Sequence, residues 1–221
     1  MTLAKIRGFM IVGLTSAVVL GVSNPAFSKN RNDYMAEVVS GCGADSSACG
    51  ALIEAAMAEI VAAGGSFGSI AGFVGRLTKQ ATKAAVAAGG SVEAIGSIAA
   101  AATNSVEAVK EAAGGANITT GLNSAVMSIA ASTASAMNSL AEAGTITPAQ
   151  AATATATAMS AVAAAAPTKA AAKALSSVAS AASSGSVSMS AVASAASSAA
   201  ASSESAAAPS GGSPTPAASP G

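Results

Sequence analysis

The segment SGCGADSSACGA, residues 40–51, holds both cysteines of this 221-residue chain. Cys42 and Cys49 are seven residues apart, with Asp45 between them. Such a pair can ligate a metal, catalyse thiol exchange or form a structural disulfide. A structural zinc site takes four Cys or His ligands, but the chain has two Cys and no His, so we expect no metal site. Catalytic pairs usually have the spacing Cys-x-x-Cys, and the longer spacing therefore favours a structural disulfide.

This chain has few of the residues that common catalytic mechanisms use. Because His is absent, the commonest general base is missing, and neither a Ser-His-Asp nor a Cys-His arrangement can form. Glu107 and Glu111 are four residues apart, but Lys110 beside them is typical of a solvated helix face. No Ser-x-x-Lys motif in a recognisable context indicates a Ser-Lys dyad. We expect a non-enzymatic protein that uses no cofactor.

Residues 1–28 have the three parts of a secretory signal peptide. Lys5 and Arg7 give a basic start, residues 9–22 are uncharged and mostly apolar, and AFS at 26–28 places small residues before the cut. The apolar stretch is shorter than the about 20 residues that span a bilayer. The alternative to cleavage is an uncleaved N-terminal anchor. We predict an exported protein, located in the periplasm, at the cell surface or in the medium.

Export strengthens the interpretation of the two cysteines, because disulfides persist outside the cytoplasm. An even number of cysteines in an exported chain indicates a bridge first. We therefore predict that Cys42 and Cys49 form a disulfide clasp within residues 29–51. The clasp would tie a short helical turn at 34–39 to a long helix that begins at Leu52.

The composition limits both the core and the partners. Hydrophobic residues make up 52% of the chain, but most of them are Ala, while charged residues are 9% and aromatic residues 2%. Burial of Ala contributes little, since the gain scales with buried apolar area. Ten basic residues match ten acidic ones, and loss of Lys5 and Arg7 with the signal peptide leaves eight against ten. Nucleic acid, which needs a basic surface, is not expected as a partner.

A repeat of about 25 residues organises the middle of the chain. The motif AAGG occurs at 62–65, 87–90 and 112–115, so successive copies start 25 residues apart. A serine follows each of the first two copies and suits a helix N-cap, and the glycine doublets suit helix ends. Apolar residues recur every three or four positions within each block, which predicts helices joined by tight turns.

The fold class that we predict is all-α: a small helical bundle or hairpin array of Ala/Ser/Gly-rich helices over residues 52–166. A further helix should begin at Pro148, after a Thr147 cap, and end before Pro167. Residues 167–221 are Ala/Ser low-complexity sequence that ends in a Pro/Gly/Ser tail, and we expect this region to be partly disordered. The large apolar residues after Leu175 are too few to hold a helix by packing.

Three glycines at a spacing of four, Gly64, Gly68 and Gly72, indicate close helix packing or contact with a membrane. The segment 60–75 carries no charge, yet it is shorter than a membrane span and is interrupted by Gly-Gly. Packing against a neighbouring helix is therefore the favoured interpretation, and membrane contact is not favoured.

Two functions from different classes remain open on the sequence. The first is an exported structural or interaction protein of the envelope, cell surface or extracellular matrix, self-associating through small-residue helix seams. The alternative is a secreted membrane-active protein, bacteriocin-like or acting at a lipid surface, that uses the Gly64/Gly68/Gly72 segment. The predicted partners are a further copy of the chain or a component of the envelope or surface.

Overall fold

The structure, a computed structural model, describes residues 29–183 together with 191 and 194. It confirms the all-α class, since these residues form seven α-helices and one short 3-10 helix and contain no strand. The elements are α1 (Arg31–Ala44), η1 (Ser46–Ala48), α2 (Cys49–Ala63), α3 (Phe67–Ala87), α4 (Val92–Ala112), α5 (Thr119–Glu142), α6 (Pro148–Ala164) and α7 (Lys169–Ser183). The predicted signal peptide lies outside the described residues, as does most of the predicted tail.

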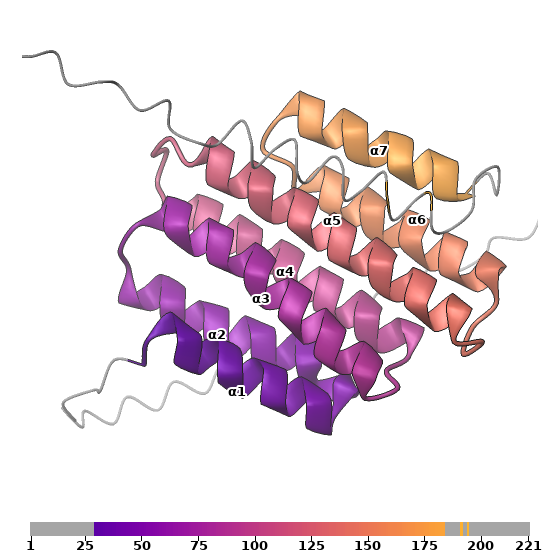
Figure 1. Cartoon of the computed structure of the whole chain (residues 1–221). Helices are drawn as coiled ribbons and strands as arrows, with labels where there is room; N and C mark the ends of the chain where they lie inside the picture. The colour runs from indigo at the N-terminus through magenta and orange to yellow at the C-terminus, as the bar shows by residue number, and fades with distance from the viewer. Residues whose placement is uncertain (1–28, 184–190, 192–193, 195–221) are drawn as a thin grey trace, which may run out of the picture.

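The helices form two layers of an antiparallel hairpin array (Figure 1). Helices α1, α3 and α5 lie in one layer, which we call the odd layer, and α2, α4 and α6 lie in the other, the even layer. The most extensive packing joins α3 to α5, which are next but one along the chain. Helix α7 closes the far end and packs on α6.

Caps and glycines set the helix boundaries. Ser91 caps α4, where its hydroxyl accepts a hydrogen bond from the amide of Ala94 at 3.2 Å, whereas Ser66 precedes α3 without such a bond. Thr147 and Gln150 form a reciprocal capping box at the start of α6. The turns after α2, α3, α4 and α5 use glycines with positive φ: Gly64, Gly65, Gly89, Gly114, Gly115 and Gly144.

Helices α3 and α4 have 21 residues each and begin 25 residues apart, at Phe67 and Val92. The apolar positions that recur every three or four residues form a seam on each helix, and the seam residues at the centre of each block are buried, as Ile70, Val74 and Leu77 of α3 show. The buried faces are wider than these seams, because each central helix contacts both layers. Phe73, Ile98 and Met137 are examples of core residues that lie outside the seams.

Two local predictions at the N-terminal side of the array are wrong. The first helix extends over 31–44, well beyond the predicted turn at 34–39, because Asn30 starts it with a capping box that includes Asp33. The second long helix begins at Cys49, three residues before Leu52. The clasp cysteines therefore belong to helices and not to a loop between them.

The prediction for the residues after Leu175 is also wrong up to Ser183. Helix α7 continues to that residue and buries Val178, Ala179 and Ala182. Thr168 helps to fix the start of α7: its hydroxyl donates to the side-chain oxygen of Asn123 in α5 at 3.2 Å, and accepts from the amide of Ala171. Small alanines suffice here because α7 lies close against α6.

Candidate functional site

The cysteine clasp is a structural element of the first hairpin. Cys42 in the last turn of α1 and Cys49 at the start of α2 are disulfide-bonded, with their Cα atoms 4.9 Å apart. Both cysteines are fully buried against the core. The predicted pairing is therefore present, and the thiol chemistry that a metal ligand or a redox nucleophile needs is consumed by the bond.

Asp45 shapes the short segment between the two cysteines. Its carboxylate accepts hydrogen bonds from the backbone amide of Ser47 at 2.9 Å and from the hydroxyl of the same residue at 2.6 Å. These hydrogen bonds from Ser47 favour the ionised carboxylate and hold the pKa of Asp45 below its ordinary value. The carboxylate thus caps the 3-10 helix and does not point toward a ligand site.

A second tie joins the other end of the α1–α2 hairpin. The phenol of Tyr34 donates a hydrogen bond to the carboxylate of Glu59 at 2.8 Å, and this bond raises the pKa of Tyr34. Lys29 forms an ion pair with Glu37 at 2.8 Å, and its hydrogen bond to that carboxylate raises the pKa of Lys29. The hairpin is therefore held by the disulfide at one end and by the Tyr34–Glu59 hydrogen bond at the other, while the Lys29–Glu37 pair fixes the residues before α1 to that helix.

No metal centre is assembled in the part of the chain that the structure describes, where no three Cys, Asp or Glu side chains come together. The predicted pair of acids on α4, Glu107 and Glu111, is exposed to solvent, as is Lys110 beside it. These three side chains lie on the surface of α4. The arrangement offers charge for docking, which is a different use from acid–base chemistry.

The three predicted glycines do not share a helix. Gly64 has φ 75° and ends α2, whereas Gly68 and Gly72 lie within α3. A Cβ atom added at any of the three would meet no other atom of residues 29–183, 191 and 194 within 4 Å, apart from the local backbone. The prediction of close packing is therefore wrong for Gly64 and Gly72, whereas the main chain of Gly68 lies at a close contact with Gly121 of α5. In the sequence the three glycines look like one stripe of a single helix only because their spacing of four residues continues across the turn between α2 and α3.

Other glycines carry the close helix contacts. A Cβ at Gly75 of α3 would lie 2.9 Å from the Cβ of Ser128 in α5. A Cβ at Gly121 of α5 would lie 2.7 Å from the carbonyl oxygen of Gly68 in α3. The hydroxyl of Ser128 also donates to the carbonyl oxygen of Gly75 at 3.3 Å. The α3–α5 contact thus depends on the absence of side chains at Gly75 and Gly121, two glycines that no spacing motif in the sequence marks.

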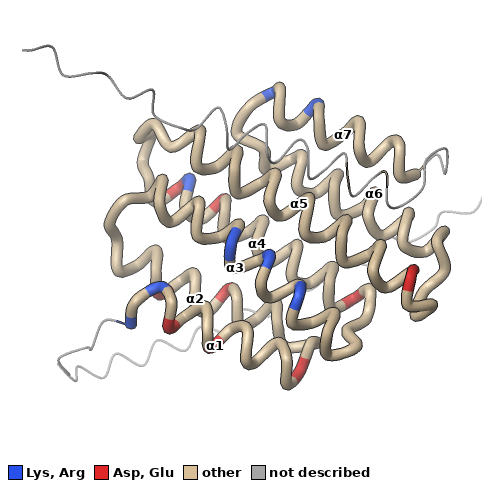
Figure 2. The backbone as a smooth tube through the Cα atoms, viewed as in Figure 1, with Lys and Arg blue, Asp and Glu red and all other residues tan. Residues whose placement is uncertain are grey.

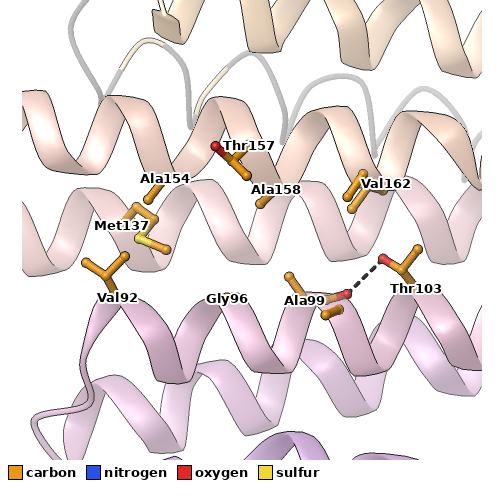
Figure 3. A pocket seen from close by; sticks show the side chains of 11 residues that line it. Val92, Gly96, Ala99, Thr103, Met137, Ala154, Thr157, Ala158 and Val162 are labelled. Carbon is orange, nitrogen blue, oxygen red and sulfur yellow. Dashed lines mark hydrogen bonds between the residues drawn. The ribbon is translucent and has the colours of Figure 1, made fainter. Parts of the chain in front are cut away.

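An apolar groove runs between α4 and α6 on the even layer, with a volume of about 320 Å³ (Figure 3). The lining is almost entirely alanine, valine and methionine, with two threonines and one glycine. Its residues are Val92, Gly96, Ala99, Ala100, Thr103, Met137, Ala154, Thr157, Ala158, Ala161 and Val162. Thr103 donates its hydroxyl to the carbonyl of Ala99 at 2.8 Å, so that this polar group is already satisfied. The groove offers shape and apolar surface but no anchor for a charged ligand.

The outward face of α2 is an alanine ridge, by which we mean Ala51, Ala55, Ala58 and Ala62. All four are exposed and follow one another at helical spacing. The helical stretch Ser46–Ala63 is the one stretch of the described residues that is long and apolar enough to cross a membrane by length and composition, and only a third of it is buried. The outer face of α2 therefore carries an apolar strip along its centre, and the exposed acids Glu54 and Glu59 flank this strip on either side.

Comparison with known protein families, with curated proteins and with solved structures finds no match to this chain. The functional argument therefore rests on the surfaces of the array itself.

Proposed function

We propose that this chain is an exported, non-enzymatic structural or interaction protein of the envelope, cell surface or extracellular matrix that self-associates. The observation that carries the proposal is the alanine ridge at the open end of the hairpin array. Arrays of helical hairpins bury their faces by stacking, and their terminal units need a polar outer face to remain soluble as single molecules. The centre of the outward face of α2 carries alanines in place of polar residues, so we expect a further protein surface to cover it.

The two ends of the array differ in this respect. The outward face of α7 carries Lys169, Lys173, Ser176, Ser180 and Ser183, all exposed. That face has the polar character expected of a terminal cap. The contrast supports association through the α2 end and not through a general stickiness of an alanine-rich chain.

A membrane-active protein is the second candidate, and the apolar stretch Ser46–Ala63 is the observation that favours it. The segment that carries this alternative in the sequence, 60–75, is split between two helices by the turn at Gly64 and Gly65. Insertion would therefore have to use α2, which would require the disulfide-linked hairpin to open away from α4. This rearrangement is the reason why we place the membrane function second.

The proposal is tested by sedimentation velocity of the exported protein over a hundredfold range of concentration. We expect oligomers that dissociate on dilution, and we expect Ala58→Glu on the ridge to shift the protein toward monomers. Ala170→Glu on the exposed start of α7 is the matched control and should leave association unchanged. A wild-type protein that stays monomeric at every concentration, or that instead releases dye from liposomes, would overturn the proposal.

Location is tested separately by fractionation of the source cells. The protein should be found in the envelope, the periplasm or the medium, without residues 1–28 at its N-terminus. A protein that fractionates with the cytosol and retains those residues would contradict the export part of the proposal.

A further inference from the structure

Three unpaired cations form a basic stripe on the outward face of α3. Arg76, Lys79 and Lys83 are exposed and follow one another at spacings of three and four residues, on the side opposite the buried face of the helix. Helix α3 contains no acidic residue. None of the three cations has an ion-pair or hydrogen-bond partner among residues 29–183, 191 and 194. Figure 2 shows them side by side along α3. At about 1.5 Å per residue, the stripe is about 10 Å long.

An acidic cluster lies on the outward face of the even layer, on the other side of the array. Glu107 and Glu111 are exposed one helical turn apart on α4. Glu54 of α2 reaches the same face of α4, because its carboxylate accepts a hydrogen bond at 3.0 Å from the side-chain amide of Asn104, which lies three residues before Glu107. Lys110 is the one basic residue of α4, and its position in the helical period places it to the side of this cluster.

We propose that the basic stripe on α3 of one copy docks on the acidic cluster of a second copy, so that chains stack face to back. This inference rests on the proposed function, because it names a contact through which the chain self-associates. The acidic cluster borders the alanine ridge of α2, which belongs to the same layer. The contact would therefore combine charge complementarity with apolar cover for the ridge.

A second copy fits these surfaces better than another partner does, because both complementary halves are present on one chain. The neighbouring acid on α1, Glu37, is already paired with Lys29, and the outward positions of α5 beside the stripe are mainly serine. The two halves lie on opposite faces of the α3–α4 hairpin, so the contact is heterologous. Such a contact leaves a free basic and a free acidic face on every dimer and generates open chains of copies.

Salt provides the first test of this contact. The screening length falls from about 10 Å at 0.1 M salt to about 3 Å at 1 M. We expect the association measured by sedimentation velocity to weaken by about tenfold or more over this range. Association that strengthens or stays constant with salt would overturn the charge contact while leaving self-association, and thus the proposed function, intact.

Matched pairs of substitutions provide the second test. Lys79→Gln with Lys83→Gln should weaken association about tenfold, the effect of two surface ion pairs of about 0.7 kcal/mol each, which is within their usual range. Lys169→Gln with Lys173→Gln on α7 removes the same charge from the same residue type and should have no effect. Equal effects of the two pairs would overturn the inference, because net charge alone would then explain them.

A mixing experiment makes the test specific. Arg76→Gln with Lys79→Gln and Lys83→Gln blocks one face, and Glu54→Gln with Glu107→Gln and Glu111→Gln blocks the other. Each variant alone should be mainly monomeric, whereas the mixture should give dimers and nothing larger, since each dimer has both free faces blocked. A mixture that stays monomeric, although each variant keeps the helical circular dichroism of the wild type, would overturn the inference.

The two proposals fail in distinguishable ways. A wild-type protein that is monomeric throughout removes both. A protein that associates equally well with every charge variant removes only the face-to-back contact. Stripe variants that keep full self-association but lose binding to phosphatidylglycerol vesicles would also overturn it, because the stripe would then serve an anionic lipid surface.

Discussion

Two glycines three residues apart on α3 should respond in opposite ways to the same substitution. Gly72 lies on the outward face, where a Cβ would meet no atom of the described residues within 4 Å. Gly75 lies on the buried face against α5, where a Cβ would come 2.9 Å from the Cβ of Ser128 and 3.4 Å from the Cα of Ala125. Both sites are helical, so Ala gains the same intrinsic helix propensity at each, about 1 kcal/mol.

The difference between the two variants isolates the helix–helix contact. Gly72→Ala should raise the free energy of unfolding by about 0.5 to 1 kcal/mol, since nothing opposes the propensity gain. Gly75→Ala must move α3 and α5 apart by about half an ångström to restore ordinary carbon–carbon separations, and such overpacking costs about 1 to 3 kcal/mol. The two variants should therefore differ by about 1 to 3 kcal/mol, with Gly75→Ala the less stable.

Urea unfolding followed by circular dichroism at 222 nm measures this difference, with the disulfide left intact. A difference of about 1 kcal/mol corresponds to about 2 to 4 °C in melting temperature for a domain of this size. Variants of equal stability would refute the reasoning, because they would show that α3 and α5 do not approach closely at Gly75.

Three further outcomes are expected. Iodoacetamide labelling of the non-reduced protein in denaturant should find no free thiol, and labelling at both positions would contradict the clasp. Cys42→Ser with Cys49→Ser should lower the free energy of unfolding by about 2.5 kcal/mol, the chain-entropy value for a loop of about eight residues. Thr155→Val should leave the free energy of unfolding unchanged or raise it by up to about 1 kcal/mol, since the buried hydroxyl of Thr155 has no hydrogen-bond partner among the described residues. Thr78→Val removes a 2.8 Å hydrogen bond to a main-chain carbonyl and should therefore give the less stable protein of the two, and thermal melts that rank them the other way would contradict this. Asp45 has a lowered pKa in the folded chain, so its contribution to stability is present above its ordinary pKa and is lost as the pH falls through the folded value. The unfolding curves of wild type and Asp45→Asn should therefore differ at pH 7 and coincide at pH 2, and a difference in stability that stays constant with pH would exclude the carboxylate as the cause.

The regular part of the fold was predictable from the sequence because local signals agree there. Ser91, the glycine turns and the apolar periodicity of α4 all indicate the same boundaries, and the structure has them. Where a single signal stood alone, the prediction was wrong. The short α1 prediction followed apolar residues and missed the Asn30 cap, which extends the helix through a polar start.

The close contacts were not predictable from spacing, because glycine has two unrelated uses that look alike in a sequence. Gly64 supplies a positive φ that ends a helix, whereas Gly75 supplies room for a neighbouring helix. Telling these uses apart requires knowledge of which helices are neighbours. In this array the most extensive contact is between α3 and α5, which are separated along the chain by the whole of α4.

The candidate surfaces were hidden from the sequence for the same reason. Arg76, Lys79 and Lys83 are evident as basic residues, but their unpaired state depends on what α1 and α5 place beside them. The cluster of Glu54 with Glu107 depends on α2 lying next to α4. Charge on adjacent segments cancels in the composition, although the two layers separate it in space.

This separation explains how a nearly neutral chain can have directional surfaces. Alanine-rich helices bury little area for each residue, so the array gains stability by close approach, as at Gly75 and Gly121, and needs few large side chains. The same composition leaves the outward faces low in charge, and the few charged groups then dominate each face. A basic face and an acidic face on opposite layers favour stacking into open chains, because a heterologous contact generates a ring only where its rotation closes.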